Sequence, residues 1–214
     1  MLLLLIQIQI DYVGGLFSQA GLNPNTNNIA MWDGKNWNSL QNGINGQVFA
    51  LAFDSNSNRL YVGGQFSQAG STPNTLNIGM WDGTNWNSLQ NGISGPAYVL
   101  AFDSNSNRLY VTGLFSQAGS TPNTSNIAMW NGSNWNSLQN GTTGYVSALA
   151  FDSNSNQLYV GGSFSQVGST PNTSNIATFF VFGVEPACEN SPPTYNRFEF
   201  ESKARVLTYP VVPF

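Results

Sequence analysis

The chain has 214 residues, of which 7% are charged, where about 25% is usual in globular proteins. Six Trp, 8 Tyr and 14 Phe argue against disorder, because disordered chains lack large apolar groups. Histidine is absent and Cys188 is the single cysteine, which excludes an internal disulfide, histidine-based zinc sites and the commonest general base.

A 49-residue repeat organises most of the chain. Residues 60–108 and 109–157 are identical at 36 of 49 positions, and a fourth copy begins at Leu158 and ends near Ala177. Each copy opens on a Tyr-Val-x-Gly-x-Phe-Ser-Gln segment, at Tyr12, Tyr61, Tyr110 and Tyr159. The sequence therefore predicts three full copies and a partial one.

Residues 1–11 depart from the repeat. A/T-rich codons for the expected Phe-Asp-Ser-Asn-Ser-Asn-Arg-Leu, read one base later, encode Leu-Ile-Gln-Ile-Gln-Ile-Asp-Tyr, which is the sequence from Leu5 to Tyr12. We hypothesise that this segment is a repeat strand read out of frame, with more repeats encoded upstream. One alternative is a genuine N-terminal strand, because Ile-Gln-Ile-Gln-Ile alternates as an edge strand does. The other is a targeting signal, although the apolar run Leu2–Ile6 is short and lacks a preceding basic region.

The pattern of apolar runs and turn signals predicts four short strands in each full unit. In the second copy these are residues 48–53, 60–66, 77–81 and 86–89. Asp-Gly before the last strand and the Asp-Ser-Asn-Ser-Asn cluster after the first are turn signals. No window has the spacing of an amphipathic helix. Four antiparallel strands in a unit of this length are typical of a propeller blade, so we predict an all-β propeller of four-stranded antiparallel blades.

The units resemble kelch-like β-propeller repeats over residues 12–178. They are most similar to the LYVGGxF…AG…NIAxWDGxxWxxL repeats of secreted and surface proteins, some of which are labelled as cell-polarity-marker propellers. The resemblance implies the fold and is nearly silent on function. Thr112 departs from the pattern by replacing the first glycine of the Gly-Gly doublet, which indicates that this position tolerates a β-carbon.

The segment 179–214 is atypical. Seven of the 16 charges lie between Glu185 and Arg205, together with Cys188. Residues 178–182 replace the expected Met-Trp-Asp-Gly and could still complete a third strand. Residues 197–200 and 205–209 are further strand candidates, and a poorly ordered tail is the alternative.

Three copies and a fragment do not obviously close a ring, since propellers typically have about four to eight blades. The ring could be completed by a blade from the terminal segments or by a partner chain, or the gene product could be truncated. Unpaired strand edges would invite self-association.

Six tryptophans are the candidate ligand-facing residues, because an exposed indole presents an apolar face to a sugar ring. They are Trp32, Trp37, Trp81, Trp86, Trp130 and Trp135. The other interpretation is packing between blades, and the invariance of these positions across the copies favours it.

The carboxylates suit turns better than catalysis or metal binding. Asp33 and Asp82 have Asn131 as their counterpart in the third copy, a swap that a turn allows and an acid–base pair does not. The cluster at 54–58 begins like a calcium loop but lacks the later glycine and bidentate glutamate, so calcium binding is the weaker alternative. We predict no catalytic, metal-binding or cofactor-binding residues.

The sequence therefore predicts a noncatalytic propeller scaffold that binds a protein or a glycan through repeated Gly-Ser-Thr-Pro-Asn-Thr loops, whose copies would add avidity. One alternative is a structural surface, extracellular or virion component that self-associates through blade edges, and another is a fragment of a larger propeller protein. We expect a secreted, surface or virion location rather than a cytoplasmic one. Six scattered basic residues argue against a nucleic-acid partner, and no apolar run is long enough to span a membrane.

Overall fold

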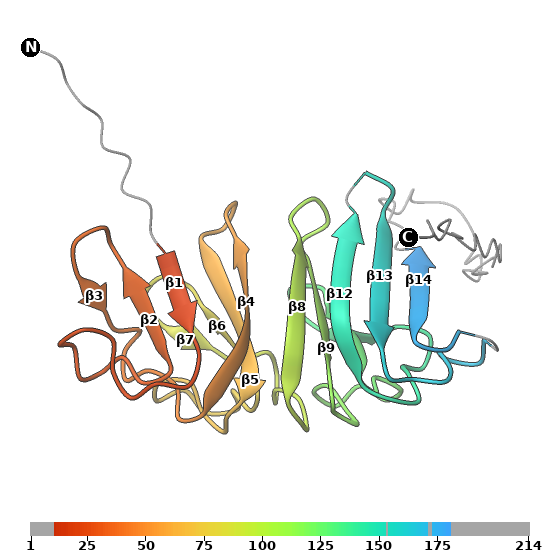
Figure 1. The fold of residues 1–214 in the computed structure, drawn as a ribbon, viewed down its shortest axis with the longest axis horizontal. Coiled ribbons are helices and arrows are strands. Elements are labelled where there is room, and N and C mark those ends of the chain that lie inside the picture. Colours follow the sequence, from red (N-terminus) through yellow and green to blue (C-terminus); the bar gives the residue numbers. More distant parts are fainter. Residues whose placement is uncertain (1–10, 153, 171–172, 181–214) are drawn as a thin grey trace, which may run out of the picture. The chain divides into compact units, whose positions relative to one another are not determined.

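The computed structural model describes residues 11–152, 154–170 and 173–180. All of them belong to the first of two units into which the chain divides, with the boundary after Phe182. This described part is all-β and consists of four antiparallel sheets (Figure 1). The predicted fold class is therefore confirmed, and we number the sheets as blades 1 to 4 in chain order.

Blades 2 and 3 have the predicted four strands, each paired with the next along the chain. Blade 2 contains β4 (Gln47–Asp54), β5 (Arg59–Gln65), β6 (Ile78–Trp81) and β7 (Trp86–Asn87). Blade 3 contains β8 (Ala97–Asp103), β9 (Arg108–Gly113), β10 (Ile127–Trp130) and β11 (Trp135–Ser137). A β-bulge interrupts the first strand of each blade, between Val48 and Ala50 in β4 and between Ala97 and Val99 in β8.

Blades 1 and 4 have three strands each within the described residues. Blade 1 contains β1 (Asp11–Gly14), β2 (Ile29–Trp32) and β3 (Trp37–Asn38). Blade 4 contains β12 (Val146–Asp152), β13 (Gln157–Gly162) and β14 (Ile176–Phe180). The third strand expected near Thr178 is present, since β14 pairs with β13.

Several predictions concern segments outside the described residues: the N-terminal segment 1–10, the strand candidates at 197–200 and 205–209, and Cys188. A search of the described residues for a helix that is both long and apolar enough to cross a membrane found none.

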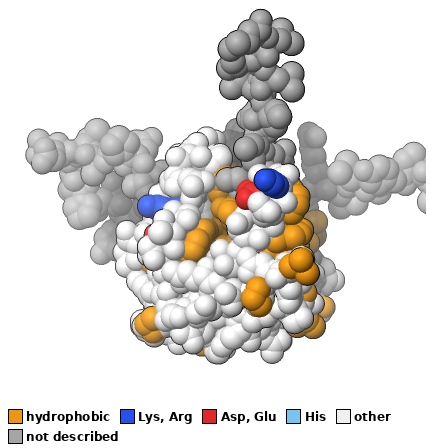
Figure 2. Space-filling view, turned by 90° about the vertical axis from the view of Figure 1, so that its left-hand side faces the viewer, with side chains coloured by type: hydrophobic (Ala, Val, Ile, Leu, Met, Phe, Trp, Pro, Cys, Tyr) orange, Lys and Arg blue, Asp and Glu red, His pale blue; other side chains and the backbone are white. Residues whose placement is uncertain are grey.

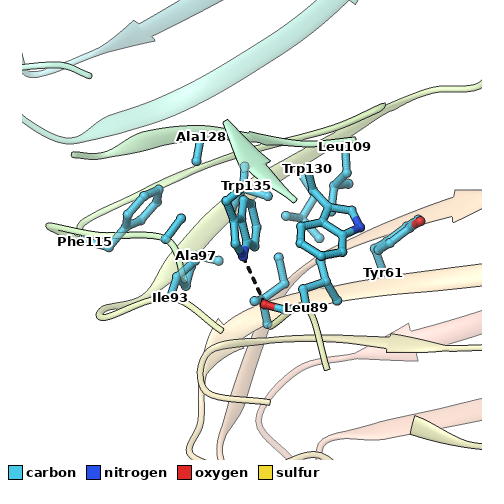
Figure 3. Close-up of a cluster of buried hydrophobic side chains, with 13 residues drawn as sticks. Tyr61, Leu89, Ile93, Ala97, Leu109, Phe115, Ala128, Trp130 and Trp135 are labelled. Atoms are coloured by element: carbon cyan, nitrogen blue, oxygen red, sulfur yellow. Dashed lines mark hydrogen bonds between the residues drawn. The ribbon is translucent and has the colours of Figure 1, made fainter. Parts of the chain in front are cut away.

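The hydrophobic cores lie between neighbouring blades. We call the face that a blade turns toward the next blade its trailing face, and the opposite face its leading face. Between blades 2 and 3, Tyr61 and Ile78 on the trailing face pack with Ala97, Leu100 and Trp130 of blade 3 (Figure 3). Equivalent clusters join blades 1 and 2 and blades 3 and 4. Because each core needs two blades, the fold is held together mainly by repeated blade-to-blade burial.

Ring contacts cross each of these boundaries at the same place. Tyr61 stacks on Phe102 of the next blade with ring centroids 5.4 Å apart, and Tyr110 stacks on Phe151 at 5.5 Å. Tyr12 meets Phe53 at 5.8 Å in a tilted arrangement. The tyrosine that opens each repeat is therefore a packing residue wherever a next blade is present.

The Gly-Gly doublet lies inside the second strand and allows close approach of the next blade. A β-carbon on Gly63 would lie 2.9 Å from the Ala97 Cβ, closer than side chains normally pack. In blade 3 this position is Thr112, which is fully buried and whose hydroxyl has no hydrogen-bond partner. Thr112 shows that the position accepts a β-carbon, and the threonine there carries a buried unpaired hydroxyl.

Candidate functional site

Four of the six tryptophans are buried. Trp81, Trp86, Trp130 and Trp135 are between 3% and 8% exposed. The Trp135 Nε1 donates a hydrogen bond to the Leu89 carbonyl at 3.0 Å (Figure 3), and the Trp86 Nε1 donates to the Leu40 carbonyl at 3.0 Å. Both acceptors lie in the connector that joins the preceding blade to the blade of the tryptophan. This placement supports the packing interpretation for these four indoles.

Trp32 and Trp37 of blade 1 are only half-buried. They contact each other as the other pairs do, with ring centroids 5.2 Å apart. Sugar stacking on these two indoles stays a prediction, because their partial exposure leaves surface for a ligand.

The aspartates near the third strands are turn residues. The Asp82 Oδ1 accepts the backbone N–H groups of Thr84 at 2.9 Å and Asn85 at 2.7 Å. Asn131 accepts the equivalent pair at 3.0 and 2.8 Å. The hydrogen bond from the Asn85 backbone, followed by that from the Asn87 side chain, lowers the pKa of Asp82. Asp33 makes the same turn contacts, and the Asn36 backbone hydrogen bond likewise lowers its pKa. A carboxylate held ionised in this way is a poor proton donor at neutral pH.

The clusters after the first strands are hairpin turns. Asp54 and Asp103 are buried and accept the backbone N–H groups of Asn56 and Asn105, each at 3.0 Å. Asp152 accepts the Asn154 N–H at 3.0 Å. These carboxylates are therefore used within the turn. The part of the chain that the structure describes has no group of three or more His, Cys, Asp or Glu side chains placed to hold a metal.

The most regular exposed feature is the loop between the second and third strands, which we call the Pro-Asn loop. Its copies are residues 21–26, 70–75, 119–124 and 168–173. In blade 2, Pro73 and Asn74 are exposed while Thr75 is fully buried beneath them. The Thr75 hydroxyl accepts the Ala69 N–H at 2.8 Å and donates to the Thr72 carbonyl at 3.0 Å. The buried threonine thus fixes the shape of the loop from inside.

The same bonds recur in every blade. In blade 3, Thr124 accepts the Ala118 N–H at 2.8 Å and donates to the Thr121 carbonyl at 3.1 Å. Thr26 and Thr173 occupy the equivalent positions in blades 1 and 4 and make the same two bonds. The loops of blades 2 and 3 therefore present their prolines and asparagines in the same conformation, with Asn74 and Asn123 at left-handed φ values of 60° and 58°.

In blades 1, 2 and 3 an asparagine just after the loop ties it to the connector that leads to the next blade. Asn77 adopts a left-handed φ of 59°, and its side chain accepts the Phe66 N–H at 3.1 Å and donates to the Ile93 carbonyl at 3.0 Å. Asn28 and Asn126 make the same forward bond at 2.8 and 3.0 Å. Sequence reasoning missed this residue, although its recurrence every 49 residues just before the third strand was a usable signal.

The loops are also bonded to the connector behind them. The Gly70 N–H donates to the Gly43 carbonyl at 2.7 Å, and Gly119 donates to Gly92 at 2.8 Å. The loops of blades 2 and 3 are thus held between two connectors, which fixes the position of one loop relative to the other.

A shallow, open depression lies beside the last loop. It is lined by hydroxyl and amide groups with one aromatic ring: Thr143, Ser163, Phe164, Ser165, Ser174 and Asn175. Its lining carries no charge, so it offers hydrogen bonds to a neutral polar group rather than acid–base chemistry.

Comparison with known proteins supports the fold and supplies a family. A search of curated proteins found no match. The model of the Rax2 C-terminal beta propeller domain matches residues 25–137, from the first Pro-Asn loop to the end of β11. The match supports propeller repeats in this chain. It does not identify them as kelch repeats, so the kelch-like pattern is still only a resemblance. Because it covers more than half of the sequence, the chain belongs to the Rax2 C-terminal beta propeller domain family.

Proposed function

We propose that this chain is a noncatalytic propeller scaffold that binds a protein or a glycan through its Pro-Asn loops. The observation that carries the proposal is the repetition of one exposed loop in blades 1, 2 and 3, held in each by the same buried threonine. A binding surface that is already ordered loses little conformational freedom on binding. Several copies at fixed spacing convert weak single contacts into avidity.

The exposed groups of the loops suit a neutral, polar ligand. Blades 2 and 3 present Ser71 and Ser120 beside the exposed Pro-Asn pairs, and none of these side chains is charged. Amide and hydroxyl groups can donate and accept hydrogen bonds, and the proline ring adds an apolar face. Glycan hydroxyls or an uncharged peptide segment match this chemistry. A net charge of −4 with few charged side chains provides little long-range steering of charged ligands.

The roles of the carboxylates support a noncatalytic function. Asp33, Asp82 and Asp54 each accept backbone hydrogen bonds within their own turns. A secreted or surface location, rather than a cytoplasmic one, remains part of the proposal. It rests on the polar, weakly charged composition and on the repeat resemblance.

The test is a glycan array probed with the full chain, followed by affinity measurements on any hit with loop variants. In the first variant, Pro73→Ser and Asn74→Gly alter the exposed groups of one loop, since glycine adopts the same left-handed φ. The second variant adds Pro122→Ser and Asn123→Gly. We expect a several-fold loss of affinity from the first and a loss of about tenfold or more from the second.

The control carries Ser55→Ala and Ser104→Ala, which change exposed side chains in the hairpin turns after β4 and β8. It should bind like the unchanged chain. If the array gives no hit, the same variants are tested on a protein captured by the unchanged chain. Equal binding by the control and by both loop variants would show that the loops are not the binding site.

A further inference from the structure

The trailing face of blade 4 is exposed where its counterparts are buried. Ile176 is 71% exposed, whereas Ile78 and Ile127 are 0% exposed. Tyr159 is 41% exposed, whereas Tyr110 is 0% exposed. These residues have the same identity and the same place in their blades. The difference is that blades 1, 2 and 3 each have a following blade packed on this face.

The leading face of blade 1 is likewise more exposed than the leading faces of blades 2 and 3. Val13 is 42% exposed, while Val62 and Val111 at the same position are 0% exposed. Trp37 is half-buried, while Trp86 is 3% exposed. Figure 2, which views the molecule from the side of blade 1, shows hydrophobic side chains at the surface there. The two end blades therefore expose, within the described residues, counterparts of side chains that meet at the three interfaces inside the chain.

We propose that a second copy of this chain docks head to tail, with the leading face of its blade 1 on the trailing face of blade 4. The internal interfaces show which surface fits this face. In the cluster between blades 2 and 3, Ile78 lies with Val111 and Trp135. At the head-to-tail contact, Ile176 of one copy would meet the equivalent residues of the other, Val13 and Trp37.

The chemistry of the two faces is compatible with this occupant. Both faces expose aliphatic or aromatic side chains whose burial is favourable. Asp11 lies where blades 2 and 3 have Leu60 and Leu109, so one margin of the leading face is polar. A head-to-tail contact either closes into a ring or continues as a filament. Two copies with four sheets each would place eight blades in a ring, within the range of about four to eight known for propellers.

This contact uses blade faces, whereas the sequence suggested self-association through strand edges. It is independent of the Pro-Asn loops, so it can fail while the proposed function stands. It also predicts that the contact joins two different surfaces, one from each copy. Neither surface pairs with itself, which a contact between strand edges does not require.

The experiment is sedimentation equilibrium of the full chain over a wide concentration range, with one variant for each face. The unchanged chain should approach twice its monomer mass of 23.1 kDa. Ile176→Glu and Val13→Glu should each sediment as monomers, because each places a charge in the contact. A mixture of these two variants should regain a 1:1 dimer, because Ile176→Glu retains an intact leading face and Val13→Glu retains an intact trailing face.

The matched control is Leu114→Glu, an equivalent change at a side chain that is 54% exposed on the enclosed blade 3. Gln65 and Ser163 occupy this position in blades 2 and 4, so a polar side chain fits there, and the variant should still dimerise. Circular dichroism and the thermal midpoint verify that each variant is folded. The proposal is wrong if the unchanged chain is a monomer at every concentration, if either face variant still dimerises, or if the mixture remains monomeric.

Discussion

Blade 2, enclosed between two neighbours, and blade 4, whose trailing face is exposed, are built from nearly the same residues but differ in burial. Tyr61 and Ile78 are at most 2% exposed in blade 2, while Tyr159 and Ile176 are 41% and 71% exposed in blade 4. The bonds within the Pro-Asn loop are alike in both blades, since Thr75 and Thr173 each accept a backbone N–H at 2.8 Å. The comparison separates local structure, which each repeat forms for itself, from burial, which requires a neighbour.

The following predictions test this distinction between local structure and burial by a neighbouring blade. In the first three, the measured quantity is the free energy of unfolding in urea. Measurements are made at low protein concentration, because association would add stability to the folded state.

The largest difference is expected at the repeated isoleucine. Ile78→Ala should lower the free energy of unfolding by about 2–5 kcal/mol, because it leaves a cavity in the core between blades 2 and 3. Ile176→Ala removes the same atoms from an exposed site and should change the free energy by less than about 0.5 kcal/mol. Equal losses at the two positions would show that the trailing face of blade 4 is covered in the monomer.

The next difference concerns the asparagine whose side chain bonds to the connector leading to the next blade. Asn77→Ala should cost about 1–3 kcal/mol, because it leaves the Phe66 N–H and the Ile93 carbonyl without their partner. Asn175 is exposed and has a similar left-handed φ, 65° against 59°, so the backbone strain introduced by alanine is matched. The difference between the two variants isolates the side-chain hydrogen bonds. A loss from Asn175→Ala as large as that from Asn77→Ala would assign the effect to the backbone instead.

A pair of buried threonines in blade 3 should respond with opposite signs. Thr112→Val should raise the free energy of unfolding by about 1 kcal/mol, because it replaces a buried unpaired hydroxyl with a methyl group. Thr124→Val should lower it by about 1–2 kcal/mol, because the Thr124 hydroxyl both accepts and donates a hydrogen bond. If Thr112→Val destabilises the chain, the cause would be a tight fit of this side chain against blade 4.

The last effect is absent at neutral pH and appears only in alkali. Burial raises the pKa of Tyr110 from 10.0 to about 12, against the opposing influence of Arg108. The unfolded chain ionises this tyrosine first, so its contribution to stability is complete below pH 10 and is lost as the pH rises toward 12. Tyr110→Phe should reduce the loss of stability across this window. Ultraviolet absorbance of tyrosinate should show one fewer late-titrating tyrosine in that variant, and an unchanged titration would contradict the assignment.

Much of the fold could be predicted because its signals are local. The strands expected at residues 60–66 and 77–81 agree with β5 and β6 to within one residue at each end. The Asp-to-Asn exchange between Asp82 and Asn131 correctly indicated a turn, since either side chain accepts the same backbone N–H groups. Alternation of apolar residues and turn chemistry act over a few residues, so a single repeat is enough to reveal them.

The candidate site was less accessible to sequence reasoning. The repeated tryptophans were compatible with sugar stacking or with packing. Only the connector from blade 1 to blade 2, which places the Leu40 carbonyl beside the Trp86 indole, showed that this indole is bonded internally. Asn77 was overlooked because its acceptor, the carbonyl of Ile93, lies 16 residues away on the path to another blade.

By itself the sequence determined the repeat, the strands within each blade and the turns between them, because these depend on backbone preferences and short-range hydrogen bonds. The tertiary structure decided which identical side chains are core and which are surface. Ile78 and Ile176 have the same identity and the same place in the repeat, and they differ because one is covered by the following blade and the other is not. Burial is a property of two surfaces in contact, so a residue's own identity cannot fix it.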